Sequence, residues 1–349
     1  MRVVSVVGTR PNLIKMAPVA AELARRGIDH VLVHTGQHYD DEMSRVFLDE
    51  LGIGEPDHRL DVGALPPGEQ TGRILERLAP VLRSAAPDLV LVPGDVTSTL
   101  AAALCASQLE LRLGHVEAGL RSFDRTMPEE RNRVLCDQLA DELFTHSPEA
   151  AANLAREAAP GRVHAVGNTM IDTLVALQGA IAARSAATAL GLTPGSYLLV
   201  TLHRPALVDG PLLPETLVRL SELARHLPVV FPVHPRTRAR IGDVSGVRLC
   251  PPLGYLDFLS LVTDARGVLT DSGGIQEETT FLGVPCLTLR DTTERPITVE
   301  LGTNLLLGLD PRRIADVPEL IEQVARRPHR IPSGWDGRAS ERIADVLLG

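Results

Sequence analysis

Short apolar runs alternate with amphipathic stretches along the whole chain. The first run, Val3–Val7, is rich in β-branched residues and is typical of a buried strand, and the next stretch has the spacing of an amphipathic helix. The same alternation predicts further strands near residues 30–35, 88–92, 112–116, 144–146 and 163–166, and helices near residues 13–26, 41–51, 69–86 and 101–108. Strands and helices that alternate at this rhythm indicate a parallel sheet with helices on both faces.

A second alternating series follows a helical stretch over residues 168–187 and a run of small and turn-forming residues, Ser185–Pro194. Its strands are expected near residues 197–201, 229–233, 247–250, 267–269 and 286–289, and its last helices near residues 312–326 and 338–348. We therefore expect an α/β protein whose two Rossmann-like domains, residues 1–168 and 169–335, face each other across a cleft. A helix within residues 336–349 is expected to pack back on the N-terminal domain.

Composition narrows the classes of protein that this chain can represent. The 349 residues carry a net charge of −9 and an aromatic fraction of only 3%, which disfavours an open nucleic-acid surface and a base-stacking platform. No apolar run approaches the length of a transmembrane helix, and the N-terminus reads as a strand rather than a signal peptide. Four scattered cysteines favour free thiols in a reducing compartment. We expect a cytoplasmic protein that binds neither nucleic acid nor membranes.

The stretch TDSGGIQEE combines a strand end, two glycines and the start of a helix. Gly273 and Gly274 let backbone N–H groups approach a ligand closely at an electropositive helix start, so that together with Ser272 they predict a phosphate site. Glu278, just inside the helix, is placed to accept two hydrogen bonds from a vicinal diol such as a ribose, and Phe258 is a candidate to stack on a base. The alternative interpretations are a turn whose acids offset the helix dipole, and a phenylalanine buried for packing.

Two cations follow the first strand. Arg10 and Lys15 lie where the strand gives way to a helix, and we place Lys15 in the first helical turn, where a cation opposes the dipole. Because an unfavourable placement hints at function, we expect the pair to hold a diphosphate. The alternative is two solvated surface charges.

Three acids and one histidine are expected at the carboxyl ends of strands. Asp95 and Glu117 directly follow strands, Glu129 lies in a long loop expected over residues 127–133, and His203 follows the first strand of the second series. Because ligands of such sheets sit beyond the carboxyl ends of the strands, the three acids are predicted to converge. His203 has the chemistry of an acid, a base or a phosphate donor. Helix capping, surface solvation and a histidine without a chemical role remain the alternatives.

The chain resembles the non-hydrolysing UDP-N-acetylglucosamine 2-epimerase family over nearly its whole length. The motifs that carry the resemblance are, in order, GTRPNLIKMAPV, TGQHYD, GDVTST, HVEAGLRS, MPEERNR, LHRP, HPRTR, TDSGGIQEE and RDTTERP. The resemblance implies a fold like that of GT-B glycosyltransferases and epimerisation at C2 of UDP-GlcNAc, with UDP-ManNAc as the product. It also implies a homodimer. No metal or nicotinamide cofactor is expected, and no dinucleotide-binding glycine fingerprint follows the first strand.

The resemblance also assigns residues by position. The family's catalytic positions are occupied by Asp95, Glu117, Glu129 and His203. Its substrate-binding positions are occupied by Arg10, Lys15, Phe258, Ser272, Gly273, Gly274, Glu278 and Arg295. The implied reaction eliminates UDP to give 2-acetamidoglucal and then adds UDP back after a proton returns to the other face.

The chain departs from the family pattern at the activator site that many bacterial members have. The usual HRxEN is HRPAL here, so that Ala206 and Leu207 replace a Glu and an Asn, and Asp40 stands where several members carry Gln. We therefore expect hyperbolic kinetics without activation by a second substrate molecule. The alternative functions are a hydrolysing 2-epimerase, a 2-epimerase of a modified UDP-sugar, a GT-B glycosyltransferase and a binding module without activity.

Overall fold

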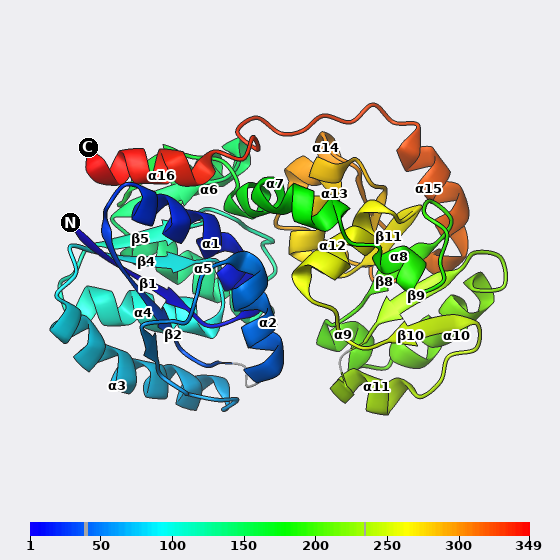
Figure 1. The fold of residues 1–349 in the computed structure, drawn as a ribbon, viewed down its shortest axis with the longest axis horizontal. Coiled ribbons are helices and arrows are strands. Elements are labelled where there is room, and N and C mark those ends of the chain that lie inside the picture. The colour runs from blue at the N-terminus through cyan, green and yellow to red at the C-terminus, as the bar shows by residue number, and fades with distance from the viewer. Residues whose placement is uncertain (38–40, 234) are drawn as a thin grey trace. The chain divides into compact units, whose positions relative to one another are not determined.

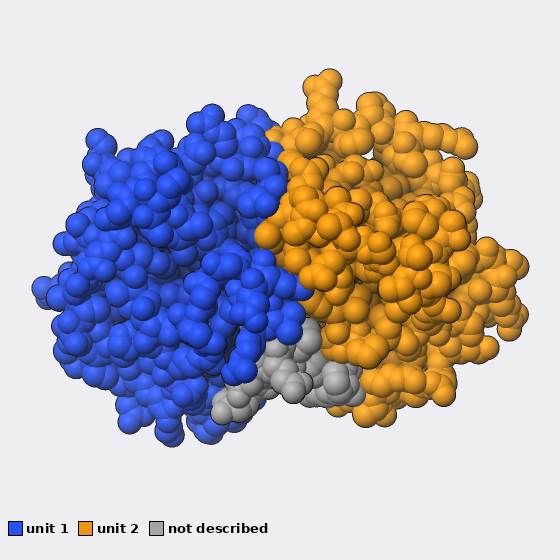
Figure 2. Space-filling model, viewed as in Figure 1, with its two compact units in different colours: residues 1–176, 333–349 blue, residues 177–332 orange. Residues whose placement is uncertain are grey.

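The computed structural model describes residues 1–37, 41–233 and 235–349, which divide into two compact units. Unit 1 comprises residues 1–176 and 333–349, and unit 2 comprises residues 177–332 (Figure 2). The sequence predicted that the N-terminal domain ends at residue 168 and that the chain returns to this domain from residue 336. In the structure, unit 1 continues into helix α7 (Thr169–Ala182) and resumes at Ser333.

The described residues of unit 1 form a seven-stranded parallel sheet with the order β3-β2-β1-β4-β5-β6-β7. Figure 1 labels β2, β1, β4 and β5 of this sheet. Its strands are β1 (Arg2–Val7), β2 (Asp29–His34), β3 (His58–Arg59), β4 (Leu89–Pro93), β5 (Leu113–Val116), β6 (Glu142–Thr145) and β7 (Arg162–Ala165). Its helices, besides α7, are α1 (Arg10–Arg25), α2 (Asp41–Leu51), α3 (Pro67–Ala85), α4 (Thr97–Gln108), α5 (Pro128–Leu139), α6 (Pro148–Arg156) and α16 (Ala339–Leu348).

Helices cover both faces of this sheet, because successive side chains of a strand point to opposite sides. Val90 and Val92 of β4 belong to the core that includes residues of α3 and α4. Leu89 and Leu91 belong to a second core with residues of α1 and α16. The fully apolar strands that the sequence suggested are therefore explained by burial on both faces.

The described residues of unit 2 form a six-stranded parallel sheet with the order β10-β9-β8-β11-β12-β13. Its strands are β8 (Leu198–Thr201), β9 (Val229–Pro232), β10 (Val247–Cys250), β11 (Gly267–Thr270), β12 (Cys286–Thr288) and β13 (Asn304–Leu306). Its helices are α8 (Ala186–Ala189), α9 (Pro205–Val208), α10 (Leu213–Leu223), α11 (Pro235–Ile241), α12 (Tyr255–Thr263), α13 (Gly273–Leu282), α14 (Pro296–Glu300), the 3₁₀ helix η1 (Pro311–Asp316) and α15 (Val317–Ala325).

Each sheet has one point where the strand order reverses. In unit 1 the chain moves to one side from β1 and to the other side from β4, and these two strands are neighbours. In unit 2 the same relation holds between β8 and β11. Ligands of open α/β sheets bind outside the carboxyl ends of the strands at such a switch point. The segments that follow β1, β4, β8 and β11 are therefore the places to look for a site.

Helix α5 corrects one expectation. Residues 127–133, which we expected in a long loop, include the first turns of a helix that begins at Pro128. Proline suits a first turn because its fixed φ is helical and its missing N–H has no intrahelical partner there. The pattern of apolar residues did not predict this helix, because its buried face carries the polar residues Glu130, Arg133 and Asp137.

Two other helices begin or end differently from their expected limits. Helix α1 begins at Arg10 with Pro11 in its first turn, so that Lys15 lies in the second turn and the argument from an opposed dipole does not apply to it. The stretch expected as one helix over residues 168–187 is interrupted after Ala182 and continues as the short α8.

The C-terminal segment is fixed to unit 1 by polar contacts. Asp172 of α7 accepts hydrogen bonds from the backbone N–H groups of Ala339 and Ser340 at 3.0 and 2.7 Å, so it caps α16 from another helix. The indole of Trp335, which is 1% exposed, donates to the carbonyl of His146 at 3.0 Å. Within the described residues, no helix has both the length and the apolar character that crossing a bilayer requires.

Candidate active site

The turn after β4 lies beside two of the predicted site residues of unit 1. Gly94 has φ of 65°, a conformation that favours glycine, and its N–H donates to the carbonyl of Val116 at 3.0 Å. A Cβ at this position would lie 3.0 Å from Nζ of Lys15 and 3.5 Å from Oε2 of Glu117. The turn that carries Asp95 therefore passes directly over these two side chains.

Lys15 and Glu117 form a buried ion pair. Their side chains are 7% and 3% exposed, and Nζ of Lys15 donates to Oε2 of Glu117. Glu117 follows β5 with φ of 70°, which is strained for a residue other than glycine. The sequence predicted functional roles for both residues but placed Lys15 on a diphosphate. In the structure its ammonium lies beside the carboxylate of Glu117.

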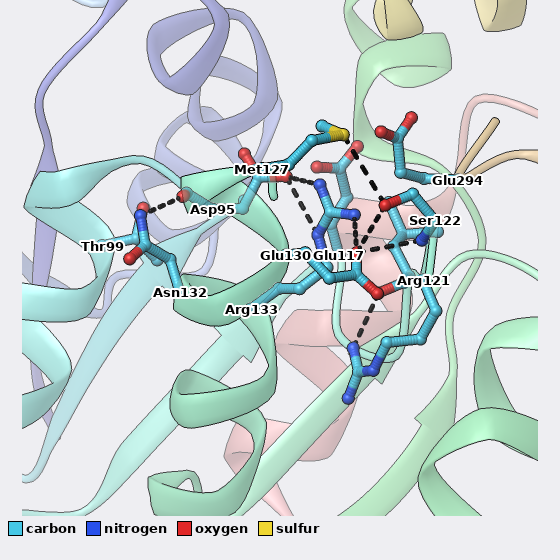
Figure 3. A network of polar contacts seen from close by, with 12 residues as sticks. Asp95, Thr99, Glu117, Arg121, Ser122, Met127, Glu130, Asn132, Arg133 and Glu294 are labelled. Atoms are coloured by element: carbon cyan, nitrogen blue, oxygen red, sulfur yellow. Dashed lines mark hydrogen bonds and ion pairs between the residues drawn. The ribbon is translucent and has the colours of Figure 1, made fainter. Parts of the chain in front are cut away.

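Asp95 belongs to a second charged cluster (Figure 3). Arg133 of α5 donates to Oδ2 of Asp95 from Nε at 3.2 Å and from Nη2, and it donates from Nη1 to Glu130 at 2.7 Å. Asn132 donates its side-chain amide to the backbone carbonyl of Asp95 at 2.8 Å. Asp95 is thus held by α5 through both its side chain and its backbone, while its side chain remains 24% exposed.

Glu130 fixes the loop that precedes α5. Its carboxylate accepts hydrogen bonds from the N–H groups of Ser122 at 2.9 Å and Phe123 at 2.8 Å. The side chain of its neighbour Glu129, which the sequence predicted as catalytic, is partly exposed and forms no hydrogen bond or ion pair with any described residue. The structure brings Lys15, Glu117 and the Asp95 turn together, whereas no hydrogen bond or ion pair of the Glu129 side chain links it to them among the described residues.

Arg10 begins α1, and its guanidinium lies 5.4 Å from the centre of the Phe47 ring, a cation–π contact. Asp40 and His234 lie outside the described residues, so the expectation about the activator site stays a prediction.

In unit 2, Arg295 lies against the N-terminus of α13. A Cβ on Gly273 would lie 2.5 Å from Nη1 of Arg295, so only glycine leaves room for the guanidinium there. Nε of Arg295 is 3.0 Å from a carboxylate oxygen of Glu277, and Glu294 is shared between Arg290 and Arg295. A buried cation and a helix N-terminus at one place suit an anionic ligand such as a phosphate.

Glu278 is a buried acid next to this cluster. It is 3% exposed and accepts a hydrogen bond from the hydroxyl of Tyr255 at 2.9 Å. Burial, opposed in part by the Tyr255 hydrogen bond and reinforced by Glu277, raises the pKa of Glu278 to about 8. Phe258 lies on α12, the helix that carries Tyr255, and is half-buried.

His203 follows β8 and is paired with Asp271, which follows β11. Nδ1 of His203 is 2.8 Å from Oδ1 of Asp271. The Asp271 carboxylate also accepts from the backbone N–H groups of His203 and Arg204 at 3.0 and 2.8 Å. Burial alone would raise the pKa of Asp271, but the His203 ring and these N–H donors lower it.

Sequence reasoning missed the partners that orient these groups. Arg133, Tyr255 and Asp271 each contact a predicted site residue but were not predicted to be functional. The one available signal was position: Asp271 directly follows a strand at a switch point, as Asp95 does.

Comparison with known proteins is consistent with this geometry. The family model described as UDP-N-acetylglucosamine 2-epimerase matches residues 21–348. A UDP-N-acetylglucosamine 2-epimerase of Methanococcus maripaludis is 38% identical over 99% of this chain and 97% of its own length. A UDP-2,3-diacetamido-2,3-dideoxy-D-glucuronate 2-epimerase of Pseudomonas aeruginosa is also 38% identical, over 99% of both chains.

A solved structure extends the likeness to the fold. The UDP-GlcNAc 2-epimerase of Methanocaldococcus jannaschii, in complex with UDP-GlcNAc and UDP, superimposes with a TM-score of 0.90 and 37% identity, over 100% of this chain and 99% of its own. The likeness confirms the GT-B-like fold of two Rossmann-like units. The family model, the identity over the whole chain and the fold agree: this chain belongs to the UDP-N-acetylglucosamine 2-epimerase family.

Proposed function

We propose that this chain interconverts UDP-N-acetylglucosamine and UDP-N-acetylmannosamine by epimerisation at C2, without net hydrolysis. The observation that carries the proposal is the pair of acids Asp95 and Glu117, each beside a cation and both just beyond the carboxyl ends of the neighbouring strands β4 and β5. Ionised carboxylates with fixed positions are suited to take a proton from carbon and to return one.

The reaction proceeds by elimination and addition. A carboxylate takes the C2 proton, the electrons of the C2–H bond form a C1–C2 double bond, and the C1–O bond breaks with its electron pair on UDP. The products of this half are 2-acetamidoglucal and UDP. A proton then adds to C2 from the opposite face, and the β-phosphate oxygen of UDP adds back to C1. No redox step and no external co-reactant is needed for this balance.

The residues divide between these tasks. Asp95 and Glu117 handle protons at the sugar, with Glu129 as the third acid. Lys15, which pairs with Glu117, contributes positive charge toward the diphosphate together with Arg10.

Unit 2 holds the nucleotide. Arg295 and the N-terminus of α13, with Ser272, Gly273 and Gly274, bind the diphosphate and stabilise the charge that builds on it as it leaves. Glu278 accepts hydrogen bonds from the ribose, Phe258 packs on the uracil, and His203 acts as an acid or a base in the reaction. We also propose that the protein is a homodimer.

The experiment that tests the reaction is incubation with UDP-GlcNAc in D₂O, followed by NMR of the products. UDP-ManNAc with deuterium at C2 and little free UDP supports the proposal. Product without deuterium at C2 contradicts the elimination step. Stoichiometric UDP with free ManNAc indicates a hydrolysing 2-epimerase instead.

A second candidate is a 2-epimerase of a modified UDP-sugar. It is favoured by the Pseudomonas aeruginosa relative, whose identity to this chain equals that of the Methanococcus maripaludis relative. The same D₂O assay with UDP-2,3-diacetamido-2,3-dideoxy-D-glucuronate, run in parallel, distinguishes the two substrates by kcat/KM.

A further inference from the structure

His115 is a fully buried histidine of β5 whose two ring nitrogens both face hydrogen-bond acceptors. Nδ1 lies 2.7 Å from Oδ1 of Asp137, and Nε2 lies 2.7 Å from the backbone carbonyl oxygen of Gly94. A carbonyl oxygen only accepts, so Nε2 must carry a proton. An ionised carboxylate also only accepts, so Nδ1 must carry a second one.

Asp137 is also bound by two donors at its other carboxylate oxygen. Its Oδ2 accepts from the N–H of Gly119 at 3.1 Å and lies 2.7 Å from Nη2 of Arg121. Arg121 in turn pairs with Glu157 at 2.6 Å. A protonated Asp137 would weaken the first two contacts. With His115 doubly protonated, its positive charge and that of Arg121 balance the negative charges of the two carboxylates. With His115 neutral, this largely buried cluster keeps one uncompensated negative charge. Burying an uncompensated charge costs free energy.

The Gly94 carbonyl that His115 contacts is the link to the site. The N–H of Gly94 donates to the carbonyl of Val116, so both polar groups of this residue are bonded to neighbouring residues of β5. Glu117 is the next residue of that segment, and Asp95 is the next residue after Gly94. The imidazole of His115 therefore fixes the Asp95 turn to β5, the strand that Glu117 follows.

From this geometry we propose that His115 is a doubly protonated imidazolium that ties Gly94 to Asp137 and sets the spacing between Asp95 and Glu117. It is a positioning residue, since it acts through Gly94 and touches no reacting atom. The protonation state stands on the hydrogen bonds alone, whereas the effect on turnover rests on the proposed function.

The protonation state is tested by NMR on the full-length protein labelled with ¹⁵N-histidine, using His115→Gln to assign the signals. At the pH of the activity assay we expect each ring nitrogen of His115 to be coupled to one exchange-protected proton. In Asp137→Asn, whose amide can donate to Nδ1, we expect one of these protons to be lost. A wild-type ring with only one protonated nitrogen overturns the proposal.

The positioning role is tested with His115→Phe, which keeps a planar ring and removes both donors. Because a displacement of about 1 Å can lower turnover about 10²-fold, we expect a loss of kcat of that order with the affinity for UDP unchanged. His164→Gln is the matched control, because His164 also pairs with a buried carboxylate, that of Glu142 at 2.8 Å, in the same sheet. An unchanged kcat, or an equal loss of UDP affinity, overturns the positioning role.

Hydrogen exchange provides a readout that does not depend on the reaction. In His115→Phe we expect faster exchange in the peptide that contains Gly94 and Asp95, and no such change in His164→Gln. If His115→Phe does not fold, the same exchange measurement on Asp137→Asn replaces it. Should the wild type show no epimerisation, the proposed function fails, and the NMR and exchange results still decide the role of His115. Unchanged exchange in the peptide overturns that role.

Discussion

The carboxylate of Asp271 is fully buried and lies 2.8 Å from Nδ1 of His203, whose side chain is 63% exposed. With Nδ1 donating to Asp271, the neutral imidazole presents Nε2 as an acceptor. The two residues come from the ends of β8 and β11, the strands that flank the switch point of unit 2. The pairing thus fixes both the tautomer and the direction of the one histidine predicted to be catalytic.

Replacing Asp271 by asparagine is expected to lower turnover. The amide can donate to Nδ1 and so favours the tautomer with a proton on Nε2, which then cannot accept one. A loss of kcat of about 10²–10⁴-fold is expected if His203 acts as acid or base. Steady-state kinetics on Asp271→Asn, His203→Asn and the double variant measure this coupling. Effects of the two single variants that simply multiply in the double variant would contradict it.

The buried Glu278 predicts a pH dependence of stability. The pKa of Glu278 is about 8 in the folded protein and about 4.3 for an unfolded glutamate. Between these values the folded state binds more protons, so this group makes the free energy of unfolding fall as pH rises toward 8. Glutamine cannot titrate, so the fall should be absent in Glu278→Gln. Urea unfolding of both proteins at about pH 6 and pH 8 measures the difference, and identical pH trends would show that Glu278 is ionised throughout.

The same group links UDP binding to pH. Ribose hydroxyls bind an ionised carboxylate more strongly than a protonated one, so UDP affinity should rise between about pH 6 and pH 8 in the wild type. From about pH 8 upward, where ionised Glu278 becomes the main form, Glu278→Ala removes a charged partner of the ribose and is expected to weaken UDP binding by about 1.5–3 kcal/mol. Calorimetry at both pH values checks this, and Glu278→Gln is the control, because any titration of UDP itself affects both proteins equally.

The sequence predicted the fold well where burial acts on whole strands. Runs such as Val3–Val7 are apolar because both faces of each sheet are covered, and this pattern is visible without a structure. Helix α5 was missed because its buried face carries Glu130, Arg133 and Asp137, which the periodicity of apolar residues does not detect. The two-residue strand β3 and the three-residue strand β13 are too short to give a pattern.

The candidate site was predictable in its residue types but not in its pairings. Position after a strand indicated Asp95, Glu117 and His203, because the carboxyl ends of parallel strands share an edge. Which cation lies beside which acid depends on contacts between residues far apart in the chain, such as Lys15 with Glu117. For that reason the sequence suggested Lys15 as a substrate-binding residue but did not predict its contact with Glu117.

Replacing Lys15 by methionine is expected to destabilise unit 1. It leaves the carboxylate of Glu117 buried without its ammonium partner, which typically costs about 3–5 kcal/mol. The double variant Lys15→Met/Glu117→Gln removes the charge as well and should recover a large part of that loss. Urea unfolding followed by hydrogen exchange in unit 1 measures both, since the two units need not unfold together. Equal destabilisation in the single and double variants would show that the ion pair is not responsible.

Asp95→Asn is expected to separate catalysis from nucleotide binding. Arg133 keeps its bond to Glu130 and Asn132 keeps its bond to the backbone of residue 95, so the turn should stay in place. The lost carboxylate can no longer take or return a proton, and kcat should fall by about 10²–10⁴-fold. UDP affinity, which we assign to unit 2, should remain within about twofold of the wild type, since this change removes no proposed UDP contact. Kinetics and calorimetry on Asp95→Asn are compared with Asp49→Asn, a change of the same charge at an exposed position of α2. If Asp95→Asn and Glu278→Ala lose UDP binding to the same extent, the division of tasks between the two units is wrong.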